Sequence, residues 1–170
     1  FGTAETGLHR LSPDGRVRHY AHDPAVADSL HSNGVSHLGV DPRDGSLWVG
    51  TKGGVARWDG QGFARLPEAS LASLLIDGLT VDKGGDVWMG MHGAGMVRRA
   101  DGRIEQLPWM DPVLGQPALH MLLEDTHGAR WLDTRSGLAW ERDGQVENVP
   151  LYSTTSRGLV RPAWSTAYED

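Results

Sequence analysis

Short apolar runs alternate along the chain with clusters of glycine, proline and aspartate. No stretch of useful length places apolar residues three and four apart, the spacing that marks an amphipathic helix. One well-marked segment instead predicts four short strands, at residues 36–41, 47–51, 55–58 and 63–66. Asp59-Gly60 lies between the third and the fourth. Because Asp-Gly supplies the positive φ angles of a type I′ hairpin, we expect the strands to be antiparallel.

The pattern is repeated, and each full copy has a tryptophan in its second strand. The three tryptophans, at steps of 40 and 43 residues, are Trp48, Trp88 and Trp131. An aspartate six or seven residues before each tryptophan ends the first strand and is followed by a glycine turn. These aspartates are Asp41, Asp82 and Asp125. We expect each carboxylate to cap its own turn.

Both ends of the chain match parts of further copies. Gly2-Thr3, Gly7-Leu8 and Asp14-Gly15 fit the later half of a copy, whereas residues 167–170 fit the opening strand of another. We therefore expect a single segment over residues 1–170. Its blades are a partial one at 1–35 and full ones at 36–75, 76–118 and 119–163, with 164–170 as the first strand of the next blade or a closing strand.

A lone sheet of four strands cannot bury both of its faces, so successive sheets must stack. Copies of about 40–45 residues with four strands each are typical of propeller blades. The sequence thus predicts an all-β protein, a β-propeller with about four blades' worth of four-stranded antiparallel sheets. We expect the three repeat tryptophans to wedge between successive sheets. A part of a larger propeller is the first interpretation; closure of a four-bladed ring and assembly of two chains into one ring are the alternatives.

Two strings resemble a known repeat. "DGSLWVGTKGGVARW" resembles the two-component regulator propeller repeat, and "HDPAVADSLHSNGV" is similar to the linker between its blades. Met91 and Asp133 depart from the usual Thr and Gly of that repeat. The resemblance implies a sensor propeller on the extracytoplasmic, here periplasmic, side of the membrane in a bacterial receptor. It also implies that a histidine kinase or diguanylate cyclase output would lie elsewhere in the parent protein.

Composition and charge narrow the range of partners. The chain has 16 Lys and Arg against 22 Asp and Glu, a net charge of −6, so it lacks the positive field that a nucleic-acid backbone requires. It has no cysteine, which excludes disulfides, thiolate metal sites and cysteine nucleophiles. Its apolar runs are too short for a membrane span, so we expect membrane contact only through other parts of the parent.

No catalytic group is assembled by the sequence pattern. Glu124 and Asp125 are adjacent, so on a strand their carboxylates would point to opposite faces, and no Gly-x-Ser-x-Gly elbow is present. His19-x-x-His22 has a spacing seen in metal sites but leads into a loop with no third ligand nearby. Residues 153–156 are expected to form a polar, solvated loop. We therefore expect no catalytic residue, metal or cofactor in this segment.

The expected ligand site is the mouth of the propeller channel, which is formed by the loops between second and third strands and by the connections between blades. These loops offer seven candidate residues: Glu5, Lys52, His92 and Arg135 from the first set, and His31, Trp109 and Arg157 from the second. Lys52 and Arg135 occupy equivalent places and suit an anionic or polyhydroxylated ligand; scattered surface charge is the plainer alternative. Trp109 suits stacking, an interface, or cover for a blade edge. The expected partner is a small molecule or an oligosaccharide.

Three classes of function remain, of which the first is our prediction. It is a non-catalytic, ligand-binding sensor segment of a signal-transduction receptor. The second is a propeller enzyme of the streptogramin lyase type with a channel-face metal site, for which His92 and Glu5 would form the pair. The third is a structural assembly module whose blade edges recruit another chain, including a second copy of this one.

Overall fold

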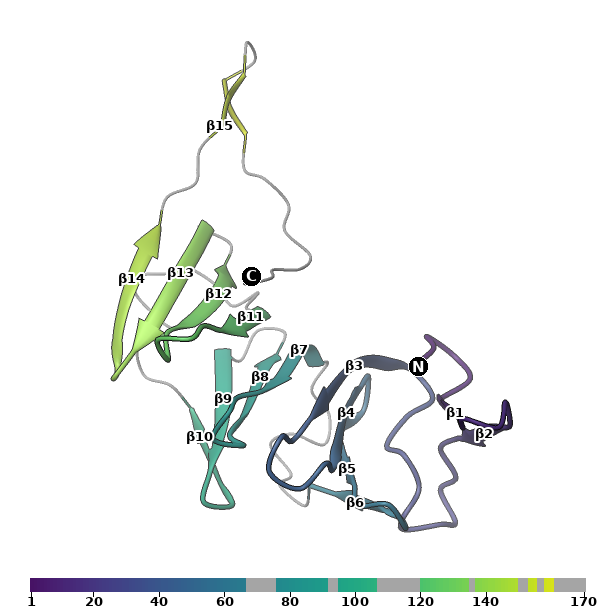
Figure 1. The fold of residues 1–170 in the computed structure, drawn as a ribbon. Helices are drawn as coiled ribbons and strands as arrows, with labels where there is room; N and C mark the ends of the chain where they lie inside the picture. Colours follow the sequence, from purple (N-terminus) through teal and green to yellow (C-terminus); the bar gives the residue numbers. More distant parts are fainter. Residues whose placement is uncertain are drawn as a thin grey trace.

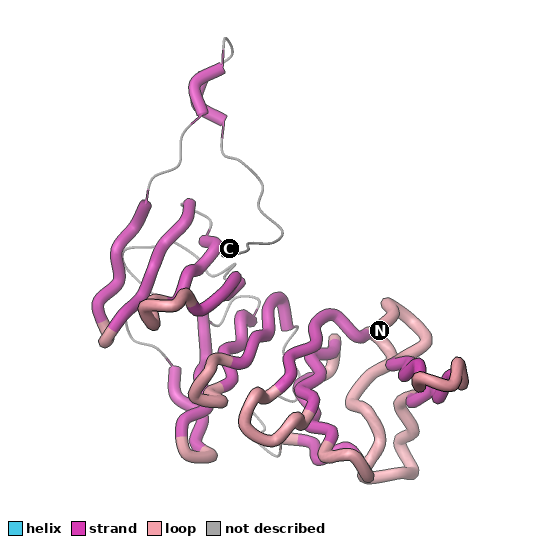
Figure 2. Tube along the Cα trace, viewed as in Figure 1, coloured by secondary structure: helices cyan, strands magenta, loops and turns pink. Residues whose placement is uncertain are grey.

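The computed structural model describes residues 1–66, 76–91, 95–106, 120–134, 137–149, 153–155 and 158–160. These residues form strands, turns and loops (Figure 2). Among them, no helix is long and apolar enough to cross a membrane. The all-β prediction is confirmed.

Within the described residues, three antiparallel sheets have four strands each, paired in chain order. The first contains β3 (Val35–Val40), β4 (Leu47–Thr51), β5 (Gly54–Trp58) and β6 (Phe63–Arg65). The second contains β7 (Ile76–Val81), β8 (Val87–Met91), β9 (Gly95–Ala100) and β10 (Arg103–Gln106). The third contains β11 (His120–Glu124), β12 (Arg130–Thr134), β13 (Gly137–Arg142) and β14 (Gln145–Val149). Met91 and Asp133 lie inside β8 and β12, so the two departures from the repeat leave these strands intact.

Two further sheets have two strands each. β1 (Leu8–Leu11) pairs with β2 (Val17–Tyr20), and the edge of β1 carries a bridge between Gly2 and Leu8. β15 (Ser153–Thr155) pairs with β16 (Gly158–Val160). The expectation of a solvated loop at 153–156 was therefore wrong for Ser153–Thr155, where two neighbouring threonines favour a strand.

The sheets follow one another along an arc, with the first strand of each full sheet on the same side (Figure 1). β3 lies beside β7, and β7 lies beside β11. The Ser36 hydroxyl on β3 donates to the carbonyl of Ile76 on β7 at 3.0 Å. Gly39 permits this close approach, because a Cβ there would lie 2.9 Å from Leu79 Cδ2. Consecutive sheets that share a row of inner strands define an arc of a propeller, as predicted.

Two of the three repeat tryptophans, Trp48 and Trp88, lie between successive sheets, as the sequence predicted. Trp48 on β4 is 2% exposed and packs against Leu79, Val87 and Met89 of the next sheet. Trp88 on β8 is 1% exposed, and the guanidinium carbon of Arg130 on the next sheet is 4.8 Å from its ring centre. A large aromatic ring between two sheets supplies apolar burial that a lone four-stranded sheet lacks.

The repeat aspartates cap their turns and, in two copies, also hold the tryptophan. Asp82 accepts the Asp86 amide at 2.8 Å and the Trp88 indole N–H at 3.0 Å. Asp125 likewise accepts the Trp131 indole N–H at 3.0 Å. In the remaining copy, where the spacing is seven residues instead of six, Asp41 is bound by Arg43 through Nε at 3.1 Å and Nη2 at 2.9 Å. Among the described residues, the buried Trp48 indole N–H then has no hydrogen-bond partner.

The Asp-Gly turns differ between copies. Asp101 and Gly102 have φ values of 50° and 82°, and Asp143 and Gly144 have 53° and 80°, which fits a type I′ turn as predicted. Between Trp58 and Phe63, which pair directly, the loop instead has four residues. Asp59 Oδ1 accepts the amides of Gln61 and Gly62 at 2.8 and 3.0 Å, so the two-residue turn predicted there was wrong. Gly60, which follows Asp59, has a positive φ of 104° and so permits this wider turn, which the Asp59 side chain closes.

Candidate functional site

Three of the predicted ligand residues lie on adjacent loops at one end of the strands. The Lys52 amide donates to the Gly34 carbonyl at 2.9 Å, which joins the β4–β5 loop to the segment that precedes β3. A Cβ on Gly34 would meet both the Lys52 side chain and the Ala4 carbonyl, the neighbour of Glu5. A Cβ on Gly53 would lie 3.1 Å from the His31 carbonyl. The loops that carry Glu5, His31 and Lys52 are thus in mutual contact.

These three residues offer groups of different charge. Glu5 and Lys52 are exposed, whereas His31 is half-buried. The other four predicted residues, His92, Trp109, Arg135 and Arg157, lie outside the described residues. In the described part of the chain, the candidate ligand face therefore consists of the Glu5 carboxylate, the Lys52 ammonium and the His31 imidazole.

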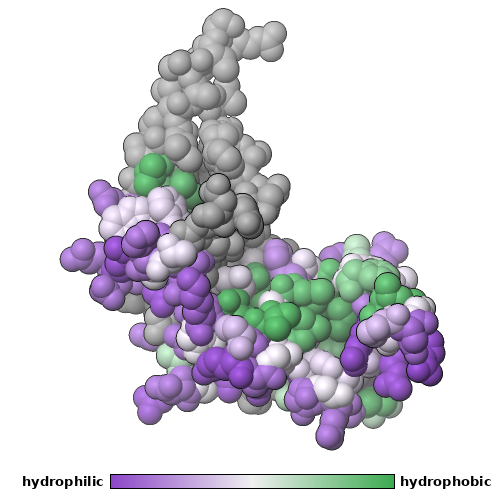
Figure 3. Space-filling view, in the orientation of Figure 1, coloured by the Kyte–Doolittle hydropathy of each residue, from purple (hydrophilic) through white to green (hydrophobic). Residues whose placement is uncertain are grey.

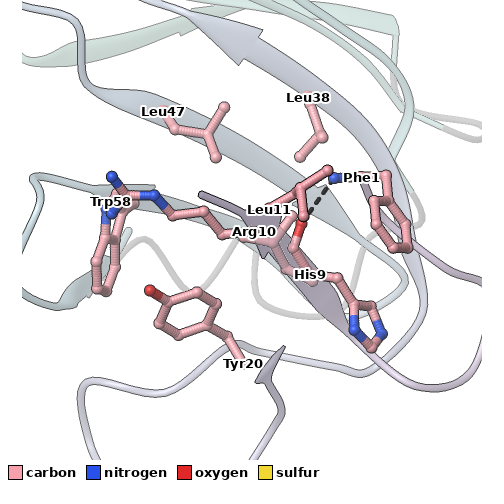
Figure 4. Close-up of a pocket in the computed structure, with 9 residues that line it drawn as sticks. Phe1, His9, Arg10, Leu11, Tyr20, Leu38, Leu47 and Trp58 are labelled. Atoms are coloured by element: carbon pink, nitrogen blue, oxygen red, sulfur yellow. Dashed lines mark hydrogen bonds between the residues drawn. The ribbon is translucent and has the colours of Figure 1, made fainter. Parts of the chain in front are cut away.

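A second surface, which lies away from the predicted ligand residues, is an apolar groove between β1 and the β3–β6 sheet. Its volume is about 370 Å³. Leu38 and Leu47 form one wall, Tyr20 and Trp58 lie at one end, and Phe1 and His9 lie at the other (Figure 4). Tyr20 packs on Trp58 with 4.9 Å between ring centres. The signal in the sequence was the first copy, which has the later glycine pattern but no repeat tryptophan.

The histidines near β1 are used in stacking and in backbone contacts. His9 stacks on Phe1 with ring centres 5.1 Å apart and on His19 at 4.6 Å. His19 also contacts the Thr6 carbonyl, whereas His22 Nδ1 lies 2.6 Å from the Leu30 carbonyl. His19 and His22 therefore have separate partners. Among the residues described, no three histidine, aspartate or glutamate side chains are grouped so that they could hold a metal ion.

Several carboxylates of the sheets are used in ion pairs and hydrogen bonds that stabilise the fold. Arg130 on β12 pairs with Glu141 at 2.9 Å and with Asp82 of the preceding sheet at 3.3 Å. The hydrogen bond from Arg43 lowers the pKa of Asp41, and the hydrogen bond from the Trp131 indole lowers the pKa of Asp125. Both aspartates are thus held ionised as acceptors at turns, which makes them poor proton donors.

The fold has relatives among solved structures. No family model matches the chain, and no curated protein matches it. An extracellular domain assigned to a hybrid two component system of B. thetaiotaomicron matches with a TM-score of 0.71 and 21% identity, over 86% of this chain and 21% of that one. A second such domain from the same organism matches with a TM-score of 0.67 and 19% identity, over 94% and 22%. Virginiamycin B lyase from Staphylococcus aureus matches with a TM-score of 0.56 and 17% identity, over 86% and 49%.

These likenesses define the class of the fold. At identities of 17–21%, the matches establish a partial β-propeller and nothing about chemistry. The chain spans about a fifth of the length of the extracellular domains that it matches. The activity and the partners of a whole protein of that kind are therefore matters for proposal.

Proposed function

We propose that this chain is a ligand-binding segment of a sensor propeller that lies on the extracytoplasmic side of a membrane-anchored bacterial receptor. The observation that carries the proposal is the fold, which matches two extracellular domains assigned to hybrid two component systems over 86% and 94% of the chain. In this proposal the segment catalyses no reaction itself, and a kinase or diguanylate cyclase output lies elsewhere in the parent protein. A periplasmic location follows from the same proposal.

The ligand face in this proposal is the end of the strands that carries Glu5, His31 and Lys52. The contacts of their loops through Gly34 and Gly53 support a common face. A carboxylate, an imidazole and an ammonium together suit a small polyhydroxylated ligand, such as an oligosaccharide, that both accepts and donates hydrogen bonds. His92, Trp109, Arg135 and Arg157 remain candidates for the same face.

A binding experiment with defined sugars tests the proposed ligand class. The chain is titrated calorimetrically with a panel of neutral and uronic-acid oligosaccharides, and each hit is repeated with Lys52→Gln. Lys83→Gln is the matched control, because Lys83 lies in the β7–β8 turn at the opposite end of the strands. We expect Lys52→Gln to weaken binding at least tenfold and Lys83→Gln to leave it unchanged. Equal effects of the two substitutions would remove Lys52 from the site.

Two further measurements separate the sensor from the other classes. The sequence of the intact parent gene should encode a membrane helix and a signalling output; a parent without either contradicts the receptor assignment. Calorimetric titration with Mg²⁺ tests the lyase class. Mg²⁺ binding that is observed in the parent chain and lost in Glu5→Gln would favour the enzyme over the sensor.

A further inference from the structure

A polar pocket of about 230 Å³ lies between the β3–β6 sheet and the β7–β10 sheet. It is formed where the β3–β4, β7–β8 and β9–β10 turns meet, at the end of the strands opposite to the candidate ligand face. Hydrophilic residues gather over this end of the strands, below the apolar surface that extends over β3 and the N-terminus (Figure 3). The pocket is lined by the buried Trp48 and by three arginines, Arg43, Arg57 and Arg99.

Two of these arginines approach one tryptophan ring from neighbouring sheets. Arg57 on β5 is the cross-strand partner of Trp48, and its guanidinium carbon lies 5.7 Å from the centre of the Trp48 ring. Arg99 on β9 approaches the same ring from the next sheet, at 5.2 Å. Arg57 also pairs with Asp44 and donates to the Ser46 hydroxyl at 3.0 Å. For Arg99, no carboxylate of the described residues lies within ion-pair distance, so its guanidinium has only the indole ring beside it.

The equivalent place one sheet further along the arc contains a carboxylate. There, Asp82 accepts the indole N–H of Trp88 at 3.0 Å and the guanidinium of Arg130 at 3.3 Å. Arg130 belongs to the next sheet, and its guanidinium carbon lies 4.8 Å from the centre of the Trp88 ring. One carboxylate therefore joins an indole N–H to a guanidinium across the boundary between two sheets. Hydrogen bonds of this charged kind are stronger than those between neutral groups.

In the polar pocket, the same two kinds of donor are present but the bridging carboxylate is not. Asp41, the equivalent of Asp82, is bound by Arg43, which also donates to the Gly85 carbonyl at 3.2 Å. Trp48 is 2% exposed, and within the described chain its indole N–H finds no acceptor. Because Trp48 and Asp41 both line the pocket, we infer that the indole N–H is directed to this end of the strands. A buried donor without an acceptor costs free energy, and an acceptor supplied by a ligand removes that cost.

The charges around the pocket determine which anion it suits. Two of its three arginines, Arg43 and Arg57, are already paired with aspartates, so among the described residues Arg99 is the cation left for a ligand. Asp86 and Asp101 also line the pocket. Their negative charges disfavour a multiply charged anion such as phosphate or sulfate. The pocket therefore suits a single carboxylate, the same group that Asp82 supplies one sheet further along.

We propose that this pocket binds the carboxylate of a small organic acid, in the place that Asp82 occupies beside Trp88. One carboxylate oxygen accepts from the Arg99 guanidinium, and the other accepts from the Trp48 indole N–H. Because Trp48 and Arg99 belong to different sheets, the bound acid joins the two sheets as Asp82 joins the next two. This inference is independent of the proposed sensor function, since the pocket and the candidate ligand face lie at opposite ends of the strands.

The indole N–H resonance of Trp48 tests the proposal in the full chain. The isotope-labelled chain is titrated with sodium acetate and followed by heteronuclear NMR, with sodium chloride of equal ionic strength as the blank. Trp48→Phe and Trp88→Phe assign the two indole peaks. We expect a saturable downfield shift of the Trp48 peak, because a hydrogen bond to a carboxylate forms there, and no shift of the Trp88 peak, which already donates to Asp82. An unmoved Trp48 peak, or equal shifts of both peaks, would overturn the proposal.

A matched pair of substitutions on one hairpin tests the role of Arg99. Arg99→Gln removes the cation on β9, and Arg103→Gln removes an exposed cation on the paired strand β10, outside the pocket. We expect Arg99→Gln to weaken acetate binding at least tenfold and Arg103→Gln to leave it unchanged. An unchanged Trp88 peak shows that each variant is folded. Equal affinities of Arg99→Gln and the parent chain would contradict the assignment of Arg99 to the site.

Inorganic anions distinguish a carboxylate site from a general oxyanion site. The parent chain is titrated with sodium sulfate and with sodium phosphate under the same conditions, and the Trp48 peak is followed. We expect both anions to bind more weakly than acetate, because Asp86 and Asp101 repel the additional negative charge. If sulfate or phosphate binds more tightly than acetate, the pocket is a site for inorganic oxyanions and the carboxylate proposal is wrong.

Discussion

The indole hydrogen bonds provide a comparison between two equivalent tryptophans in one protein. Trp48 and Trp88 occupy the same place in successive sheets, and both are almost fully buried. Trp88 donates to the buried carboxylate of Asp82 at 3.0 Å, whereas the Trp48 N–H has no hydrogen-bond partner in the part of the chain that the structure describes. Trp→Phe substitution removes similar ring area at both positions but removes a hydrogen bond only at Trp88.

The expected difference follows from these contacts. A hydrogen bond to a charged group contributes about 1.5–3 kcal/mol, and a buried N–H without a partner costs about 1–3 kcal/mol. Trp88→Phe loses the hydrogen bond to a charged group, whereas Trp48→Phe removes a buried N–H that has no partner among the described residues. We expect the free energy of unfolding to fall at least about 1.5 kcal/mol further in Trp88→Phe than in Trp48→Phe.

Urea unfolding followed by circular dichroism measures this difference. With a slope of about 2 kcal/mol per molar urea, the two midpoints should differ by about 0.7 M or more. Trp131→Phe is the internal control: its indole donates to Asp125 at 3.0 Å but is only half-buried, so its loss should lie between the other two. Equal losses at Trp48 and Trp88, or a larger loss at Trp48, would refute the reasoning.

Three further predictions concern the contacts between sheets. Arg130→Met should cost about 3 kcal/mol in urea unfolding, because it leaves Glu141 and Asp82 buried without their cation, and Arg130→Met with Glu141→Leu should recover part of this. Gly85→Ala should destabilise more than Gly45→Ala: both residues have positive φ, but only at Gly85 would a Cβ overlap Arg43, and a smaller thermal shift for Gly85→Ala would contradict this. The hydrogen bond from Arg43 lowers the pKa of Asp41, so the stability from this pair is present above the ordinary aspartate pKa. It is lost as the pH falls through the ordinary pKa towards the lowered pKa of Asp41. Between pH 6 and pH 3, the Tm of Arg43→Leu should therefore fall less than the Tm of the parent chain.

Much of the fold follows from local sequence. Glycine and aspartate positions determine where strands end, and the tryptophan spacing predicts how many sheets there are and which strand of each carries the interlayer ring. The capping role of Asp82 and Asp125 is likewise a local property, since each accepts amides only two to four residues away. The four-residue loop after Trp58 was missed because Asp59-Gly60 fits two turn types, and pairing of Trp58 with Phe63 decides between them.

The candidate surfaces depended on tertiary structure more than the strands and turns did. The sequence pattern indicated Glu5, His31 and Lys52 as loop residues, but contacts through Gly34 and Gly53 brought their loops together. For the groove, the missing tryptophan of the first copy was the one sequence signal, and its lining residues gave none: Leu8 and Leu38 are ordinary strand residues until two sheets are placed side by side.

The sequence alone thus determined the all-β class, the four-stranded repeat and the interlayer place of Trp48 and Trp88, because turn geometry and apolar spacing act over a few residues. The tertiary structure decided which polar groups pair. Asp82 accepts hydrogen bonds from Trp88, six residues away, and from Arg130, 48 residues away. Asp41 instead accepts from Arg43 and not from Trp48. Such competition between donors for one buried carboxylate depends on distances between neighbouring sheets, and these exist only in the folded chain.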